Sequence, residues 1–482
     1  MTASTTHRLA LAGCCLLVSL GACTVQSVSD PSAMLKPATA KNVILFIGDG
    51  MGVSTVTAAR IFDGQSKGLS GEEHELAFER FENLALAKTY NTNQQVPDSA
   101  GTATAILTGS KTRAGVINIG PDARRGSCAE SKAQRLVPLS HTAKERGLSV
   151  GFVTTARLTH ATPAVMYAHS PERGWEADSE LPDNALAAGC RDIAAQLVDG
   201  ADRWDVALGG GDRNFLGSEK GGVRAAADAE LIATWLLAAD DRRFVSTADR
   251  LASLTPGGPV LGLFSPSHLT YVAERTDTTT EPTLAQMTAT AIDLLSANDD
   301  GYFLLVEGGR IDHGHHAGKP GYALVEAQAF NRAVEAALER IDLADTLVIV
   351  TADHSHVFTL GGYPTRGNPI LGLVVNNDAS GEPRSTPDLA GDGSPYTSVA
   401  YANGPGAVGT TPRPPPDTSI GAVAQALIPT QYVSSSGQAY LTETHAGEDV
   451  AVYATGPGAE RVRGVLEQNR LYHVMRDAFG WR

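Results

Sequence analysis

The chain has 482 residues, of which 42% are apolar and 19% are charged, so it can bury a large hydrophobic core. Its formal net charge is −15, which argues against a surface that binds nucleic acid or anionic lipid. If so acidic a protein handles an anionic substrate, its site must offset the negative field locally with metal ions or arginine.

The first forty residues predict an export signal and a tether. Arg8 precedes the apolar stretch Leu9–Leu20, which is shorter than the roughly 20 residues that span a bilayer and is typical of a signal peptide (residues 1–22). Residues 20–23, Leu-Gly-Ala-Cys, resemble a bacterial lipobox, which implies lipidation of Cys23; a plain signal peptide cleaved nearby is the alternative. Residues 23–40 are rich in Ser, Pro, Ala and Thr, as flexible tethers are. We therefore expect a periplasmic or cell-surface protein that reaches a bacterial membrane only through Cys23.

Two cysteines remain beyond the signal region and Cys23. Cys14 and Cys15 would leave with the signal peptide, so Cys128 and Cys190 form an even pair in an oxidising compartment. A disulfide between them is the natural interpretation, and in the chain-entropy model it would contribute about 4 kcal/mol. Two free buried cysteines are the alternative.

Short apolar, β-branched runs alternate with helical patterns along the rest of the chain. The runs that predict strands are Val43–Ile47, Ser149–Thr154, Asp205–Leu208, Tyr302–Val306, Thr346–Val350 and Val450–Ala454. This alternation predicts an α/β fold with a mainly parallel central sheet and helices on both faces. The apolar spacing within Glu326–Ile341 predicts a helix. Residues 377–440 are rich in Pro, Gly and Ser and predict an insertion or small subdomain within a single domain of residues 41–482.

Three of the predicted strands run directly into residues that are typical metal ligands. Asp49 follows Val43–Ile47, residues 307–316 follow Tyr302–Val306, and residues 351–356 follow Thr346–Val350. Five of the 13 histidines lie within 313–316 and 354–356. Because ligands bind beyond the carboxyl ends of strands in open α/β sheets, we expect these three ends to form one site.

The residue types indicate which metals such a site prefers. Mixed carboxylates and imidazoles suit zinc, and Asp312 and His316, four residues apart, can bind one ion from a single turn of chain. Glu307 has only oxygen-bearing neighbours and suits magnesium better. Each element alone has an ordinary explanation, namely a tight turn at Gly48–Gly50, a solvated histidine loop and a helix cap at Asp353. Their combination favours a metal centre.

Ser99 is the candidate nucleophile. The Ala-rich sequence that follows it predicts a helix that starts there, and the ordinary role of serine at that position is to cap the helix. A helix N-terminus also directs backbone N–H groups and a positive dipole toward an anion. A serine hydroxyl needs a base or a metal to lose its proton. Since no base motif lies near Ser99 in the sequence, a metal is the favoured activator.

Five segments taken together resemble the alkaline phosphatases. They are Asp49–Gly52, Asp98–Ala103, Val306–His316, Thr351–His356 and Glu443–Val450. They occur in the order that the family has, and the resemblance covers residues from about 41 to 480. Chance recurrence of all five is negligible.

The resemblance implies a set of ligands and roles. It implies that Asp312, His316 and His445 bind one Zn²⁺, that Asp49, Asp353 and His354 bind a second Zn²⁺ beside Ser99, and that Asp49, Thr162 and Glu307 bind Mg²⁺. Arg173 resembles the guanidinium that holds two phosphate oxygens, a task that suits its planar fork. Cys128 and Cys190 stand where the animal branch of the family has a disulfide.

Two departures from the bacterial pattern point toward the animal branch. His160 stands where some bacterial members have an aspartate near the magnesium, and His313 stands where some have a lysine. An imidazole at His160 removes a negative charge and implies weaker binding of Mg²⁺. The animal branch also has a Ca²⁺ site, but Phe264 is followed here by Ser265 and not by an acidic residue, which makes that site doubtful; Glu281 is its candidate remnant.

The sequence therefore predicts an alkaline phosphatase that hydrolyses small phosphate monoesters over a broad substrate range through a phosphoserine at Ser99. A homodimer is the family's usual state, and no nucleic-acid surface is expected. A hydrolase of phosphodiesters or sulfate esters is one alternative, against which Arg173 and the magnesium-type ligands argue. A lipoprotein that only binds phosphate or metal is the other, but such a degenerate site should have lost ligands.

Overall fold

The computed structural model describes residues 39–409, 413, 415–429, 431–433 and 439–481. The predicted signal peptide, most of the tether and Cys23 lie outside the described residues. The described residues belong to one compact unit, Pro37–Arg482. Among the described residues, no helix is both long enough and apolar enough to cross a membrane.

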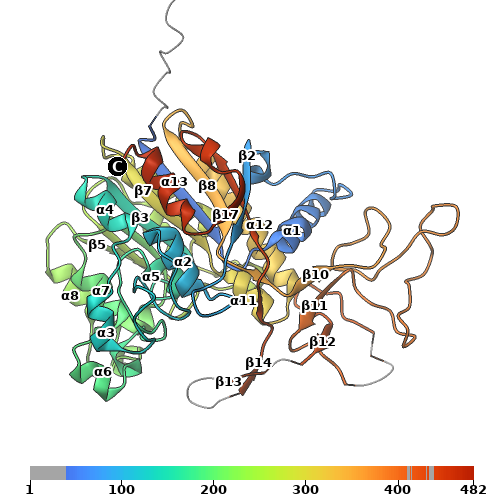
Figure 1. Cartoon of the computed structure of the whole chain (residues 1–482), viewed down its shortest axis with the longest axis horizontal. Helices are drawn as coiled ribbons and strands as arrows, with labels where there is room; N and C mark the ends of the chain where they lie inside the picture. The colour runs from blue at the N-terminus through green and yellow to red at the C-terminus, as the bar shows by residue number, and fades with distance from the viewer. Residues whose placement is uncertain (1–38, 410–412, 414, 430, 434–438, 482) are drawn as a thin grey trace, which may run out of the picture. The chain divides into compact units, whose positions relative to one another are not determined.

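A twisted sheet forms the centre of this unit (Figure 1). It has ten strands, in the order β17-β2-β16-β8-β1-β7-β3-β4-β6-β5. Its strands are β1 (Asn42–Gly48), β2 (Asn83–Lys88), β3 (Ser149–Arg157), β4 (Val206–Gly210), β5 (Arg243–Val245), β6 (Val260–Leu263), β7 (Tyr302–Gly308), β8 (Thr346–Ala352), β16 (Val450–Thr455) and β17 (Gly464–Glu467). All pairings from β8 to β5 are parallel, whereas β16 is antiparallel to both its neighbours. The predicted mainly parallel sheet is thus confirmed, and each predicted run corresponds to a strand.

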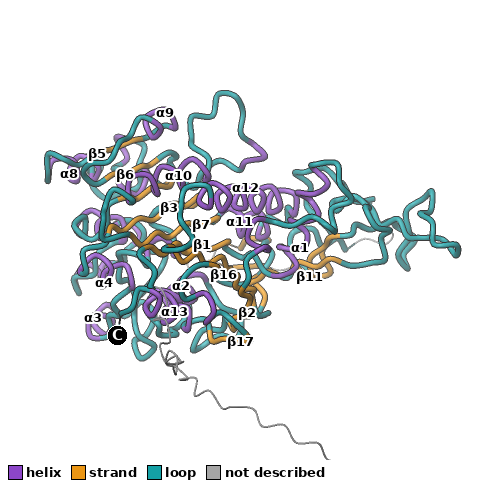
Figure 2. Tube along the Cα trace, turned by 90° about the horizontal axis from the view of Figure 1, so that it is seen from above, coloured by secondary structure: helices purple, strands orange, loops and turns teal. Residues whose placement is uncertain are grey.

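Helices cover both faces of the sheet. They are α1 (Val53–Ser66), α2 (Ser99–Thr108), α3 (Cys128–Ala133), α4 (Leu139–Glu145), α5 (Ala161–Ala164), α6 (Asp183–Ala187), α7 (Ile193–Asp199), α8 (Leu231–Leu237), α9 (Ala248–Ala252), α10 (Leu284–Leu295), α11 (Arg310–His316), α12 (Pro320–Leu338) and α13 (Arg470–Ala478). Figure 2 shows α10 and α12 on one side of the strands and α2, α4 and α13 on the other.

The helix predicted at Glu326–Ile341 is α12, but its bounds differ from the prediction. It begins at Pro320, because proline at the first helical position leaves no missing hydrogen bond and has the φ that a helix needs. It ends at Leu338, three residues before Ile341. Ile341 still packs against the core from the turn that follows, so its side chain matches the helical spacing without being helical.

Between β8 and β16 the chain leaves the main sheet. It forms a three-stranded sheet of β10 (Phe358–Leu360), β11 (Val399–Asn403) and β12 (Ala426–Ile428), and a hairpin of β13 (Gln431–Val433) and β14 (Ala439–Leu441). The predicted insertion, residues 377–440, lies within this region, although the small sheet already begins with β10. At the base of the region β9 (Ser355–His356) pairs antiparallel with β15 (His445–Ala446). That pairing returns residue 445 to the end of β8.

The carboxyl ends of three fully buried strands meet side by side. In the parallel register Gly48 of β1 lies opposite Gly308 of β7 and Ala352 of β8. Every residue of these three strands is buried, as expected for apolar runs covered on both faces. The segments that follow these strands, of which one is helix α11, therefore bring Asp49, Asp312 and Asp353 to one edge of the sheet.

Candidate active site

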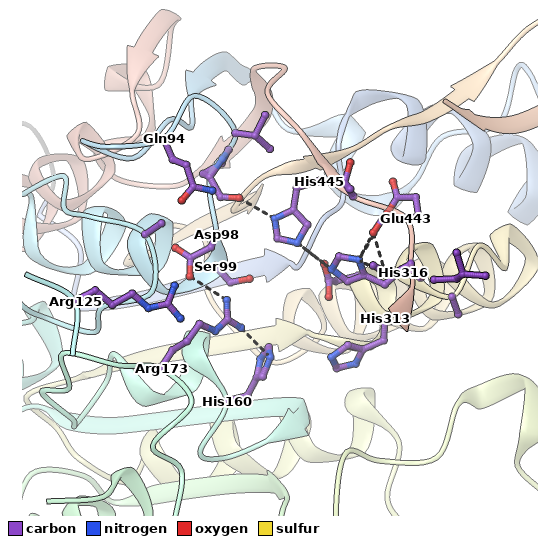
Figure 3. A pocket seen from close by; sticks show the side chains of 18 residues that line it. Gln94, Asp98, Ser99, Arg125, His160, Arg173, His313, His316, Glu443 and His445 are labelled. Carbon is purple, nitrogen blue, oxygen red and sulfur yellow. Dashed lines mark hydrogen bonds and ion pairs between the residues drawn. The ribbon is translucent and has the colours of Figure 1, made fainter. Parts of the chain in front are cut away.

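A pocket of about 810 Å³ opens at this edge. Figure 3 shows Ser99, Arg173, His160, His313, His316 and His445 converging on it from different elements. All of these are residues that the sequence predicts to act in or near the site.

Asp312, His316 and His445 bring three ligand atoms into one cluster. Helix α11 presents Asp312 and His316 on one face, and His316 Nε2 lies 3.3 Å from Asp312 Oδ1. Strand β15 adds His445, whose Nε2 lies 3.0 Å from His316 Nε2 and 3.4 Å from Asp312 Oδ1. The other nitrogen of each imidazole faces a backbone carbonyl at 2.8 Å, on Glu443 for His316 and on Pro97 for His445. Such contacts orient a histidine so that its Nε2 is free to bind a metal.

Asp49, Asp353 and His354 form a second cluster, which is completely buried. His354 Nε2 lies 3.4 Å from Asp49 Oδ1 and 3.3 Å from Asp353 Oδ2. The Gly50 N–H donates to Asp353 Oδ1 at 3.0 Å. Gly50 has a φ of +66°, and a Cβ there would lie 2.3 Å from His356 Nε2, so only glycine lets the chain turn at this point. Asp353 does not cap a helix; it directly follows the last residue of β8.

Ser99 lies beside the second cluster. It is the first residue of α2 and not its cap, because the side chain of Asp98 takes that position and accepts from Gly101 N–H at 3.1 Å. The Ser99 hydroxyl is therefore directed elsewhere: its Oγ lies 3.2 Å from His354 Nε2 and 3.5 Å from Asp49 Oδ1. The serine thus touches two of the three ligand-type residues of the cluster.

A third cluster contains unpartnered oxygens. Asp49 Oδ2, Thr162 Oγ1 and Glu307 Oε1 are buried and have no hydrogen-bond partner among the described residues. The His160 imidazole lies with Asp49 and Glu307, and its Nδ1 is likewise unpartnered. Since buried polar atoms are nearly always satisfied, this set fits a bound cation. The oxygen donors are those that Mg²⁺ prefers, and His160 adds a nitrogen.

The electrostatics of the site also fit cations. Burial, together with the charges of Asp353 and Asp312, raises the pKa of Glu307 to about 7. Burial, together with the nearby Asp353 carboxylate, raises the pKa of Asp49 well above its usual value. So many buried carboxylates repel one another unless positive charge is added, and bound metal ions supply it.

Arg173 supplies the other positive charge. Its guanidinium donates from Nη1 to Asp98 Oδ2 at 3.1 Å, and its Nη2 lies 3.1 Å from His160 Nε2. These contacts hold the planar group over the pocket next to Ser99 (Figure 3). His313 also lines the pocket, with Nδ1 3.2 Å from Arg310 Nη1.

Two residues of the site, His356 and Glu443, lie inside the recognised motifs, but the sequence indicated no role for them. His356 Nε2 lies 2.8 Å from Asp312 Oδ1, and its Nδ1 lies 2.6 Å from Glu443 Oε2. Burial alone would lower the pKa of His356, but Glu443 and Asp312 raise it to about 10. Because both neighbours accept hydrogen bonds, the imidazole must donate from both nitrogens. By contrast, His315 of the same histidine run faces Thr55 and Tyr401, away from the clusters.

The two remaining expectations concern the disulfide and calcium. Cys128 and Cys190 are bonded, with Cα atoms 5.7 Å apart, so the predicted pairing is confirmed. The Glu281 carboxylate accepts from Thr270 N–H at 2.8 Å and forms an ion pair with Arg275 at 3.4 Å. With an arginine on this carboxylate, Glu281 does not fit a Ca²⁺ ligand.

Comparisons with known proteins point to one enzyme family. A family profile described as alkaline phosphatase matches residues 40–480. The tissue-nonspecific alkaline phosphatase of Gallus gallus is 44% identical over 457 residues, which cover 90% of this chain and 84% of that protein. The Homo sapiens tissue-nonspecific isozyme is 42% identical over 457 residues, covering 90% and 83%.

Solved structures of two bacterial enzymes share the fold. The alkaline phosphatase of Thermus thermophilus has a TM-score of 0.65 and 23% identity, with coverage of 95% of this chain and 96% of that one. The alkaline phosphatase of the Antarctic bacterium TAB5 has a TM-score of 0.62 and 22% identity, with coverage of 93% of this chain and 100% of that one. The profile match and the identity to the curated relatives show that the chain belongs to the alkaline phosphatase family.

Proposed function

We propose that the chain hydrolyses phosphate monoesters through a phosphoserine formed on Ser99, with a broad range of small alcohols as leaving groups. The observation that carries this proposal is the position of Ser99 Oγ. It lies at the first residue of α2, within 3.5 Å of Asp49 and His354, on the floor of the pocket. No general base of the serine-protease kind is needed if these two residues hold a cation.

The clusters suit three ions. We propose that Asp312, His316 and His445 hold one Zn²⁺, that Asp49, Asp353 and His354 hold another, and that Asp49, Thr162 and Glu307 hold Mg²⁺ with His160 beside it. When bound, such ions lower the pKa of coordinated oxygens and offset the charge that develops on phosphoryl oxygens. Calcium is not part of the proposal, because Arg275 neutralises Glu281.

The residues of the chain perform the following steps. Arg173 binds two phosphoryl oxygens of the substrate and turns phosphorus toward Ser99. The Ser99 oxygen loses its proton and forms the new P–O bond, while the bond from phosphorus to the ester oxygen breaks and the alcohol leaves with a proton. Water then cleaves the phosphoserine, which returns the hydroxyl of Ser99 and releases inorganic phosphate. The positive N-terminus of α2 favours the anionic oxygens throughout.

Metal analysis joined to an activity assay tests this proposal. We expect the purified protein to contain zinc and magnesium, to lose monoesterase activity on treatment with a chelator, and to regain it with Zn²⁺ and Mg²⁺. A monoester, a diester and a sulfate of one aryl alcohol should be hydrolysed in decreasing order. Activity that survives complete chelation, or a preference for the diester, would refute it.

The variant Ser99→Ala tests the nucleophile separately. It should lose turnover by on the order of a thousandfold or more, as removal of a nucleophile does. Its affinity for inorganic phosphate should remain, because Arg173 and the ligand clusters are unchanged. Full activity in this variant would overturn the assignment of Ser99.

We also propose that the protein is exported and tethered through a lipid on Cys23. The proposal is supported by the signal-like sequence that precedes Cys23. In a bacterial host, Cys23→Ser should move the activity from the membrane fraction to the soluble exported fraction. Unchanged membrane association in that variant would contradict it.

A further inference from the structure

The loop that carries Arg173 is joined to a second loop at the rim of the pocket. The peptide groups of Ile117 and Ser170 exchange two hydrogen bonds, of 2.8 and 3.0 Å. Arg173 N–H donates to Gly115 O at 2.9 Å, and Gly126 N–H donates to Pro171 O at 2.8 Å. Residues 115–126 therefore form a frame around residues 170–173.

One ion pair closes this frame. Arg125 donates from Nε and Nη2 to the two oxygens of Glu172, both at 2.7 Å, which is the bidentate geometry that makes such pairs strong and directional. Glu172 directly precedes Arg173, and its Oε1 also accepts from Gly174 N–H at 3.1 Å. The carboxylate thus fixes the peptide on both sides of Arg173.

Gly115 links the ion pair to the backbone of Arg173. The Arg125 guanidinium lies against the α-carbon of Gly115, where a Cβ would be 2.2 Å from Cζ of Arg125. Gly115 also has a φ of +82°, a conformation that favours glycine. Its carbonyl accepts from Arg173 N–H. Gly115 therefore contacts both arginines, Arg125 through its α-carbon and Arg173 through its oxygen.

We propose that Arg125 and Glu172 are positioning residues that hold Arg173 in the orientation required to bind the phosphoryl group. The inference rests on the proposed function, in which Arg173 binds phosphate. The tip of Arg173 is held by Asp98 and His160, but its backbone is held by the frame that this ion pair closes. A fixed backbone lowers the conformational entropy that Arg173 loses when phosphate binds.

A direct role for Arg125 as a second phosphate-binding cation is the competing idea. Arg125 does line the pocket, and Figure 3 shows it on the same side as Arg173. Its charge, however, is already matched by both oxygens of Glu172. The two ideas predict opposite effects of removing the Glu172 charge, which makes them separable.

The test compares Arg125→Ala, Glu172→Gln and the double variant with Arg124→Ala. Arg124 is the matched control, because it forms a similar pair with Glu130, with Nε and Oε1 2.7 Å apart. Within the described residues its side chain forms no hydrogen bond or ion pair with residues 170–174. The metal-loaded, full-length enzymes are assayed for kcat, KM and inhibition by inorganic phosphate, and thermal unfolding is recorded for each.

We expect Arg125→Ala and Glu172→Gln each to raise the inhibition constant for phosphate by about tenfold, less than the ~100-fold that a 1 Å misplacement can cost. The double variant should be no worse than either single variant, since both break one contact. Arg124→Ala should behave as the wild type. Glu172→Gln is nearly isosteric with the wild type. If Arg125→Ala does not fold, the phosphate inhibition constant of Glu172→Gln alone tests the inference.

Two results would overturn the inference. One is an unchanged phosphate inhibition constant in Glu172→Gln, with or without a change in thermal stability. The other is tighter phosphate binding in Glu172→Gln with weaker binding in Arg125→Ala, which would make Arg125 a direct ligand. A wild-type enzyme without monoesterase activity would instead refute the proposed function, so the two failures are distinguishable.

Discussion

The contact between His356 and Asp312 offers a sharp test of how the first ligand cluster is supported. The two nitrogens of His356 face different partners, Asp312 at 2.8 Å and Glu443 at 2.6 Å. Two amide variants test the two contacts separately. The side-chain amide nitrogen of Asn can take the position of the histidine Nδ1, and that of Gln can take the position of Nε2. His356→Asn keeps a donor toward Glu443 and loses the one to Asp312, whereas His356→Gln does the reverse.

Both variants leave Glu443 buried without its cation. Breaking a buried ion pair on one side costs about 3–5 kcal/mol, so both should unfold at lower denaturant concentration. Only His356→Asn also frees the Asp312 carboxylate to rotate. Loss of such an outer contact typically lowers metal affinity 10–100-fold, and we expect a fall of that order in zinc affinity. Titration against a chromogenic chelator measures the affinity, and urea unfolding measures the stability.

His315→Gln is the matched control. His315 is equally buried but faces Thr55 Oγ1 at 3.0 Å and Tyr401 Oη at 2.8 Å. His315→Gln keeps a hydrogen-bonding group toward Thr55, in the position of Nε2, and loses the neutral hydrogen bond to Tyr401. This loss should cost about 1 kcal/mol and leave zinc affinity unchanged. If His356→Asn binds zinc as tightly as this control does, the contact does not support the metal ligand and the reasoning fails.

Three further predictions concern other parts of the chain. Burial lowers the pKa of His141 to about 3 and that of His169 to about 4. Because only the unfolded chain protonates these histidines between about pH 6.5 and pH 4, the free energy of unfolding should fall over that range by about 1.4 kcal/mol per pH unit for each histidine. In urea titrations at several pH values, His141→Gln should reduce this slope. His160→Asp adds a negative charge beside the third cluster, so half-maximal activation should need less Mg²⁺; an unchanged requirement would contradict this. Replacing Cys128 and Cys190 by serine should cost about 4 kcal/mol in reversible unfolding, and no change would show that the bond does not restrain the unfolded chain.

The central strands could be predicted from the sequence because they are buried on both faces. Such strands appear as unbroken apolar runs, of which β1 and β8 are examples. The edge strands gave no comparable signal. β5 has three residues and β17 has two exposed positions, so neither contains a continuous apolar run. Their pairing is decided by tertiary contacts that no local pattern records.

The ligand clusters were predictable for a related reason. Asp49 and Asp353 directly follow the buried strands β1 and β8, and Glu307 is the second-last residue of β7, so the sheet topology alone brings the three together. His445 is different, because its position depends on the pairing of β15 with β9, nearly 90 residues earlier in the chain. Only the resemblance to a family could place it. The roles of His356 and Glu443 depend on the same pairing and were missed for that reason.

The position of Ser99 shows how tertiary structure decides between two readings of one local sequence. Asp98 and Ser99 are both good helix caps, so the sequence alone allows either to begin α2. Asp98 takes the cap because its second carboxylate oxygen also pairs with Arg173, a contact that serine cannot replace. The helix then begins at Ser99, one residue earlier than a Ser99 cap would place it, and the hydroxyl points at Asp49 and His354. Capping, phosphate binding and nucleophile placement are thus coupled through a single carboxylate.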